Sequence, residues 1–149
     1  MVDRKPVVQK LVRRRDVYFT VSWSRLRKSD RYEIVKSVPS EAGIYELYYM
    51  DDKDKLCLFY VGKSWYGGLR NELRERTDIE LEKDPARRAI LEDHDCWYRW
   101  SLISSSDDMA DIIFFFAQTY LRGAASVHHS GRYERIFVTE VDADKIVTI

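Results

Sequence analysis

The chain has few cysteines, no excess of charge of either sign and no long apolar run. Its two cysteines, Cys57 and Cys96, are too few for the disulfide scaffold of a small secreted domain. The 25 basic and 25 acidic residues give a formal net charge of zero, so any nucleic-acid site must be a local patch. No apolar run reaches the roughly 18 residues that a membrane helix needs. The 149 residues, 45% of them hydrophobic, therefore predict one globular domain without a membrane partner.

The N-terminal region also lacks the pattern of a secretory signal. Lys10 and the arginines of residues 13–15 interrupt the start of the chain, so we expect a reducing, cytoplasmic location. The basic run over residues 10–15 has two interpretations. It could contact phosphates through counterion release, or it could be a solvated helix or arm.

The remaining patterns predict a mixture of strands and helices. Helix 24–36 is expected to bury Leu26, Tyr32, Ile34 and Val35. We expect further helices at residues 85–91 and 109–122, and strands at residues 17–23, 96–103, 135–140 and 145–149.

The segment over residues 109–122 is the strongest helix pattern in the chain. A Ser/Asp cluster at residues 104–107 supplies the N-cap, and Gly123 follows as a C-cap. Apolar residues cover most of the circumference, which predicts burial against a sheet. A polar stripe containing Asp108, Asp111 and Gln118 is expected to remain outside.

Two apolar runs on either side of a charged cluster predict a β-hairpin. The strands are expected at residues 43–50 and 55–61, with the turn at residues 51–54. In that register Met50 pairs with Lys55, and Tyr45 lies directly opposite Tyr60 on the same face. The alternative interpretation is an ordinary aromatic hairpin in the core.

A helix with regularly spaced arginines is expected after this hairpin. Gly67 and Gly68 precede it, and Arg70 and Arg74 lie four residues apart and so share one helical face. The pair could grip a phosphate, or it could form a solvated basic stripe paired with glutamates of the same helix.

Gly43-Ile44-Tyr45, followed by Tyr60-Val61-Gly62, resembles the paired motif of the GIY-YIG nuclease superfamily. The resemblance implies an α+β fold, with a three-stranded antiparallel sheet that could be extended and flanking helices. It implies one domain over residues 1–149, with a basic N-terminal extension and a helical insertion near residues 78–95.

The resemblance also implies roles in phosphodiester hydrolysis. Tyr45 would be the base or nucleophile activator, while Tyr60 and Arg70 would orient and stabilise the phosphate. Arg74 is the alternative arginine, and Lys63 would hold a phosphate oxygen. Nucleic acid, with DNA first, is the expected partner, and Mg²⁺ or Mn²⁺ is the expected cofactor. A phenol with an ordinary pKa near 10 needs a cation or metal-bound water to work at neutral pH.

The glutamate that holds the metal in the resembling family has no counterpart here. Gln118 occupies its position and brings no charge to a hard cation, so no residue is assigned as a metal ligand. One hypothesis is a nuclease with a rearranged metal site that uses Asp111. The alternative is a catalytically inactive module that binds nucleic acid or a protein or has a regulatory role. An unrelated α+β interaction domain is the third hypothesis. A carboxylate within metal reach of Tyr45 would favour the nuclease, and a pocket closed by Phe115 or Trp65 would favour a module that does not cut.

Overall fold

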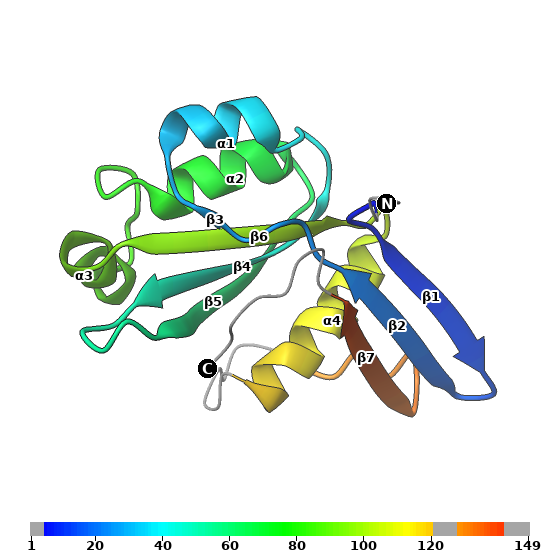
Figure 1. Cartoon of the computed structure of the whole chain (residues 1–149). Helices are drawn as coiled ribbons and strands as arrows, with labels where there is room; N and C mark the ends of the chain where they lie inside the picture. The colour runs from blue at the N-terminus through cyan, green and yellow to red at the C-terminus, as the bar shows by residue number, and fades with distance from the viewer. Residues whose placement is uncertain (1–4, 121–127, 142–149) are drawn as a thin grey trace.

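The computed structural model describes residues 5–120 and 128–141, and it confirms the α+β fold class (Figure 1). Its elements in chain order are β1 (Val8–Arg13), β2 (Asp16–Ser22), β3 (Arg27–Lys28), α1 (Arg31–Ser37), β4 (Gly43–Met50), β5 (Leu56–Ser64), α2 (Gly68–Thr77), α3 (Pro85–Asp93), β6 (Cys96–Leu102), α4 (Ser106–Thr119) and β7 (Arg135–Val141). Within these residues, no helix has the length and apolar character needed to cross a bilayer.

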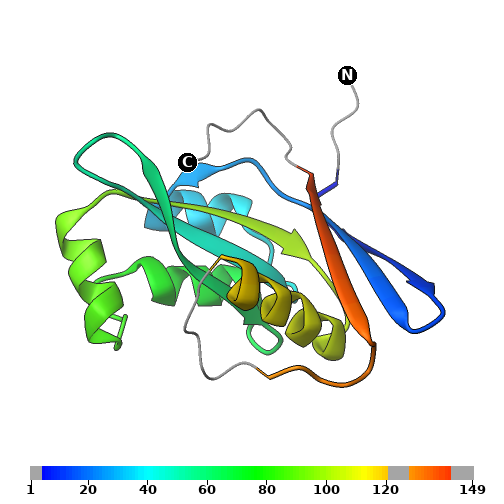
Figure 2. The same ribbon diagram turned by 90° about the horizontal axis from the view of Figure 1, so that it is seen from below.

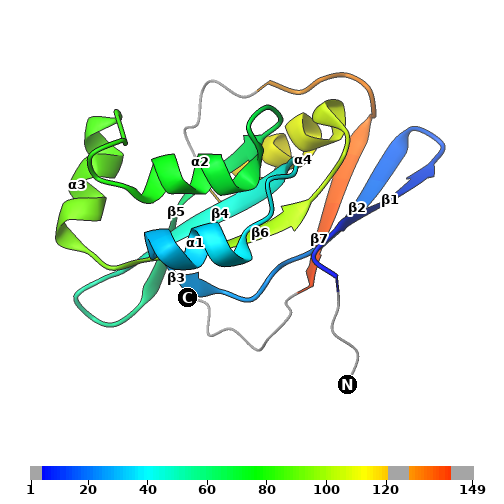
Figure 3. The same cartoon turned by 90° about the horizontal axis from the view of Figure 1, so that it is seen from above.

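The larger sheet is antiparallel and has the strand order β3-β6-β4-β5. The three long strands β6, β4 and β5 match the expected core, and the two-residue β3 extends it. Helices α1 and α2 cover one face of the sheet (Figure 3). On that face Tyr45 and Leu47 pack in a cluster with Ile34, Leu69 and Leu73. Side chains alternate along a strand, so Ile44 of β4 and Val61 of β5 point to the opposite face.

Helix α4 covers that opposite face and separates it from the second sheet (Figure 2). The second sheet has the order β1-β2-β7, with β1 and β2 antiparallel and β2 and β7 parallel. Ile112 and Phe116 of α4 pack in one buried cluster with Ile44 of the large sheet and with Val17 and Phe19 of β2. One helix therefore joins the cores of both sheets.

The hairpin of β4 and β5 is confirmed, but its predicted register is wrong. The turn is one residue longer than expected, because Asp51 N–H donates to Lys55 O and Met50 pairs with Leu56. A β-bulge next to Leu47 shifts the register by one more residue. Tyr45 therefore lies opposite Gly62, and Tyr60 lies opposite Leu47. Two shifts of one residue restore the parity, so both tyrosines still share a face.

Three other expectations need correction. The basic run over residues 10–15 is neither a helix nor a free arm, since β1 pairs with β2 and the two form a hairpin. The helix expected at residues 24–36 begins only at Arg31, after Asp30, which accepts hydrogen bonds from the backbone of Tyr32 and Glu33 as an N-cap. Because the helix starts at Arg31, a different set of residues faces the core, and Tyr32 is 76% exposed rather than buried. Val35 is also exposed, while Ile34 is buried as expected.

The polar stripe expected on the outside of α4 is partly buried. Asp111 is 1% exposed and pairs with Arg132 at 3.0 Å, and Asp108 pairs with both Arg132 and Lys10. Lys10 of β1 and Arg132 of the segment before β7 offset the cost of burying these carboxylates, because each negative charge has a positive charge beside it. The expected strand at residues 145–149, and Arg122 and Gly123 at the end of helix 109–122, lie outside the described residues.

Candidate functional site

The paired tyrosines of the hairpin lie side by side. The rings of Tyr45 and Tyr60 have centroids 5.8 Å apart, tilted by 48°. Tyr45 is completely buried, and Tyr60 is half-buried. Gly62 makes the arrangement possible, because a Cβ there would lie 2.4 Å from the Tyr45 ring and hydroxyl. The last glycine of the motif is therefore required by packing.

A carboxylate of α2 holds the hydroxyl of Tyr45. The phenol donates to Oε2 of Glu72 at 2.5 Å. Burial raises the pKa of Tyr45 well above its ordinary value of 10, and the neighbouring Tyr60 and the charge of Glu72 raise it further. The hydroxyl is therefore a hydrogen-bond donor throughout the neutral range. Activation as a base would need the opposite shift.

The Tyr45–Glu72 contact belongs to an ion-pair network that joins α2 to α3. Arg76 Nη1 lies 2.9 Å from Glu82, and Arg76 Nε lies 3.9 Å from Glu72. Glu82, only 1% exposed, also pairs with Arg87 of α3 at 3.1 Å. Burial alone raises the pKa of Glu82, but the hydrogen bond from Arg87 and the backbone of Asp84 keep it below its usual value.

Arg87 also covers the second tyrosine. Its guanidinium carbon lies 4.5 Å from the centroid of the Tyr60 ring, a cation–π distance. Both arginines near the tyrosine pair, Arg76 and Arg87, are thus already paired with carboxylates of this chain. A phosphate at this position would meet Glu72 and Glu82, which carry charge of the same sign.

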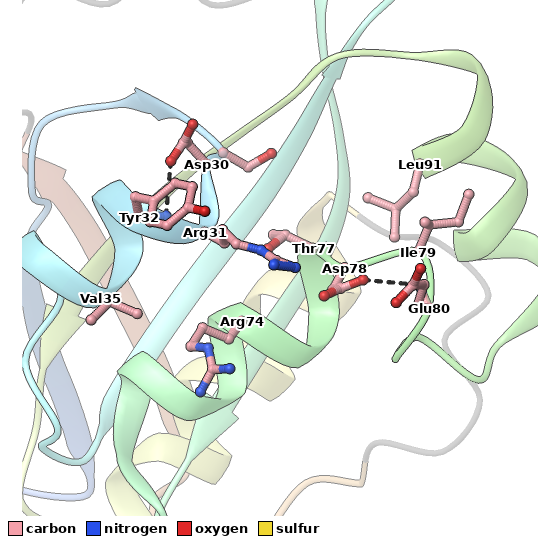
Figure 4. Close-up of a pocket in the computed structure, with 11 residues that line it drawn as sticks. Asp30, Arg31, Tyr32, Val35, Arg74, Thr77, Asp78, Ile79, Glu80 and Leu91 are labelled. Atoms are coloured by element: carbon pink, nitrogen blue, oxygen red, sulfur yellow. Dashed lines mark hydrogen bonds between the residues drawn. The ribbon is translucent and has the colours of Figure 1, made fainter.

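The arginines predicted from the motif point elsewhere. Arg70 donates from Nε to the carbonyl of Val38 at 2.7 Å, toward the connection between α1 and β4. Arg74 is exposed and lines a groove of about 560 Å³ between α1, α2 and the segment before α3, together with Arg31 and Tyr32 (Figure 4). The helix face that meets Tyr45 carries Glu72 instead.

Lys63 and Gln118 are also separated from the tyrosines. Lys63 is exposed, and alternation along β5 directs it to the face opposite Tyr60. Gln118 is exposed on α4, two residues after the buried Phe116 and so about 200° around the helix from it. Helix α4 covers the opposite face of the sheet, and Gln118 points away from it. The structure brings together Tyr45 and Tyr60 but none of the other predicted site residues.

The side chains around the tyrosines offer Mg²⁺ or Mn²⁺ little beyond one carboxylate, Glu72. Over residues 5–120 and 128–141, no three His, Cys, Asp or Glu side chains are grouped so that they could hold a metal ion. Glu72 accepts from Tyr45, both oxygens of Glu82 pair with arginines, and Asp111 pairs with Arg132. Mg²⁺ is usually held by one or two carboxylates together with waters and phosphates, so Glu72 beside Tyr45 is the residue that could hold the expected cofactor.

Sequence reasoning missed the residues that do surround the tyrosines. Glu72 and Arg76 are four apart on α2 and were interpretable as an ordinary helix pair. Glu82 and Arg87 belong to the charged segment over residues 78–95, where no periodic pattern marks a buried contact. The signal that could have identified Glu72 and Arg76 is their position on the helix face adjacent to buried Leu69 and Leu73.

A second buried polar cluster joins the two sheets on the α4 side. Arg99 donates from Nε to Glu46 at 2.6 Å, and its Nη2 lies 3.3 Å from Glu140 of β7. Glu46 accepts from the Tyr48 hydroxyl, and Glu140 accepts from the indole of Trp23. Burial raises the pKa of Glu46 to about 7, with Arg99 opposing the shift. The cluster's polar groups bind one another, which indicates a structural link between the sheets.

A family model described as "Uncharacterised protein" matches residues 7–149. The chain belongs to this family. No curated protein and no solved structure matches the chain. The family's description specifies no activity, so the resemblance to GIY-YIG nucleases stays a prediction.

Proposed function

We propose that this protein is a nucleic-acid-binding module with a GIY-YIG-like hairpin that does not hydrolyse phosphodiesters. The observation that carries the absence of cutting is the contact between Tyr45 and Glu72, while the nucleic-acid partner is what the resemblance implies. At the place where the resemblance implies an arginine for the phosphate, α2 presents a carboxylate.

The chemistry of hydrolysis supports the module that does not cut over the nuclease with a rearranged metal site. Cleavage needs a base, a positioned water and positive charge for the developing oxyanion. Here Tyr45 is protonated and buried, and Arg76 and Arg87 are neutralised by carboxylates. Gln118, at the predicted metal position, belongs to α4, which covers the face of the large sheet opposite the tyrosines. Its side chain points away from that sheet. The tyrosine pair therefore acts as a structural anchor for α2 and α3.

Binding is tested separately from cutting. The parent protein is incubated with fluorescent single-stranded, duplex and branched DNA and single-stranded RNA, with Mg²⁺ or Mn²⁺. We expect anisotropy to show binding and denaturing gels to show intact strands. Cleavage that disappears in Tyr45→Phe, which loses only the hydroxyl, would overturn the proposal of a non-cutting module. Absence of binding to every substrate would overturn the nucleic-acid assignment.

A further inference from the structure

The outer face of the small sheet carries a row of exposed apolar side chains. In β2 the residues Val17, Phe19 and Val21 point toward α4 and are buried, so Tyr18 points outward. Leu11 of β1 and Phe137 of β7 are paired with Tyr18 in register and share its face. Leu11 is 51% exposed, and Tyr18 and Phe137 are each 39% exposed.

The two aromatic rings form an ordered platform. Tyr18 and Phe137 have ring centroids 4.9 Å apart and planes within 13° of parallel. Stacking on each other fixes the orientation of both rings while leaving part of each in contact with solvent. Because their orientation is already fixed, these rings can stack with a further planar group more effectively than single aromatic side chains scattered over a surface.

Positive charge lies beside this row, on the side of the turn between β1 and β2. Arg13 and Arg135 flank Asp16 in register, and Arg14 and Arg15 form the turn between β1 and β2. Residues 13–15 are exposed, and Arg135 has a side chain that is 68% exposed. Asp16, 3.5 Å from Arg135, offsets part of this charge. Glu134, whose N–H donates to Arg15 O, brings a second carboxylate nearby.

We propose that this outer sheet face is a binding surface for single-stranded nucleic acid. This proposal rests on the proposed function and names its binding site. Phosphates contact Arg13, Arg14 and Arg15, and an unpaired base stacks on the Tyr18–Phe137 platform. Charge complementarity selects an anionic partner, since arginines outnumber carboxylates at this end of the small sheet although the formal net charge of the chain is zero. The aromatic platform selects single strands, whose unpaired bases are free to stack on it, whereas the bases of a duplex are stacked on one another.

The arginines and the Tyr18–Phe137 platform are expected to have different roles in binding. Replacing the arginines should weaken single-stranded and duplex binding alike, because both polymers present phosphates. Replacing the rings should weaken single-stranded binding and leave duplex binding unchanged. The difference separates this site from a non-specific basic patch.

The experiment uses the full chain and fluorescence anisotropy with a labelled single-stranded oligonucleotide and the matching duplex. Tyr18→Thr/Phe137→Thr removes the platform but keeps residues that favour strands. We expect it to lower single-stranded affinity about tenfold for each base stacked. Arg13→Gln/Arg14→Gln/Arg15→Gln should weaken both substrates and reduce the salt dependence of binding.

Matched controls come from other exposed positions. Tyr32→Ala removes a more exposed aromatic from α1, and Lys53→Gln removes a charge from the turn between β4 and β5, and both should bind like the parent. Circular dichroism confirms that each variant is folded. If the parent binds but the platform variant binds single strands equally well, the assigned surface is wrong while the proposed function stands. If the platform variant instead dissociates a dimer of the parent, the face is an interface between copies. If the parent binds no nucleic acid, both proposals fail.

Discussion

The hydrogen bond between Tyr45 and Glu72 has a measurable energetic consequence. Tyr45→Phe removes a hydroxyl that is fully buried and donates to a carboxylate at 2.5 Å. A hydrogen bond to a charged group contributes about 1.5–3 kcal/mol. The Glu72 side chain is 26% exposed and lies 3.9 Å from Arg76, so water and that arginine still stabilise its charge after the substitution. We therefore expect a loss near the lower end, about 1.5–2 kcal/mol in the free energy of unfolding.

A double-mutant cycle isolates this contact. Urea unfolding of the parent, Tyr45→Phe, Glu72→Gln and the double variant should give a coupling energy of about 1–2 kcal/mol. Tyr66→Phe is the matched control, because Tyr66 is 91% exposed and should change stability by less than about 0.5 kcal/mol. A coupling energy within error of zero would show that Glu72 does not hold the phenol in solution.

The same contact predicts a pH dependence. Burial raises the pKa of Tyr45 well above 10, while the unfolded phenol ionises near 10. The unfolded state then loses its proton first, so the free energy of unfolding should fall as the pH rises above about 10. Tyr45→Phe should lack this component. A phenol that ionises near neutral pH, followed by ultraviolet absorbance, would refute the structural role.

Three other substitutions test separate parts of the structure. Gly62→Ala should destabilise the fold by about 1–3 kcal/mol or more, since the new Cβ would lie 2.4 Å from Tyr45, and thermal unfolding with no loss would contradict that packing. The pKa of Glu46 is raised from 4.5 to about 7, so the free energy of unfolding should fall by on the order of 3 kcal/mol as the pH rises from about 4.5 through 7. Chemical unfolding of Glu46→Gln should show no such fall. If the variant keeps the same pH dependence as the parent, the fall belongs to other groups. Gln118→Glu should gain neither Mg²⁺ affinity by calorimetry nor nuclease activity, because residue 118 lies on the opposite side of the sheet from the tyrosines. A gain in either property would contradict this separation of residue 118 from Tyr45 and Tyr60.

The hairpin shows what sequence can predict about this fold. Alternation and the charged turn located β4 and β5 closely, and the shared face of Tyr45 and Tyr60 is confirmed. The register was missed because loop length and the bulge near Leu47 depend on local hydrogen bonds and sheet twist. No residue type in the motif marks that bulge.

The phase of α2 explains why the site differed from expectation. Gly67 and Gly68 both adopt positive φ, of 82° and 78°, and Gly68 packs so tightly on Ser40 that a Cβ would lie 2.5 Å from its carbonyl carbon. This contact fixes how the helix is rotated when it reaches the sheet. The spacing of Arg70 and Arg74 established that they share a face, but the face that meets Tyr45 is set by tertiary packing.

The charged residues of α4 were misplaced for a related reason. Asp108 and Asp111 were expected in solvent because charges are rarely buried alone. Their partners Lys10 and Arg132 come from distant parts of the chain, and a single sequence carries no signal for such pairs.

The central claim is tested most directly by one assay that records binding and strand cleavage on the same sample. Labelled single-stranded DNA is titrated with the parent protein in Mg²⁺ and then in Mn²⁺, anisotropy is measured, and the strands are resolved on a denaturing gel. The proposed function predicts saturable binding with the strands intact in both metals. Cleaved product from the parent, and none from Tyr45→Phe at equal binding, would contradict it.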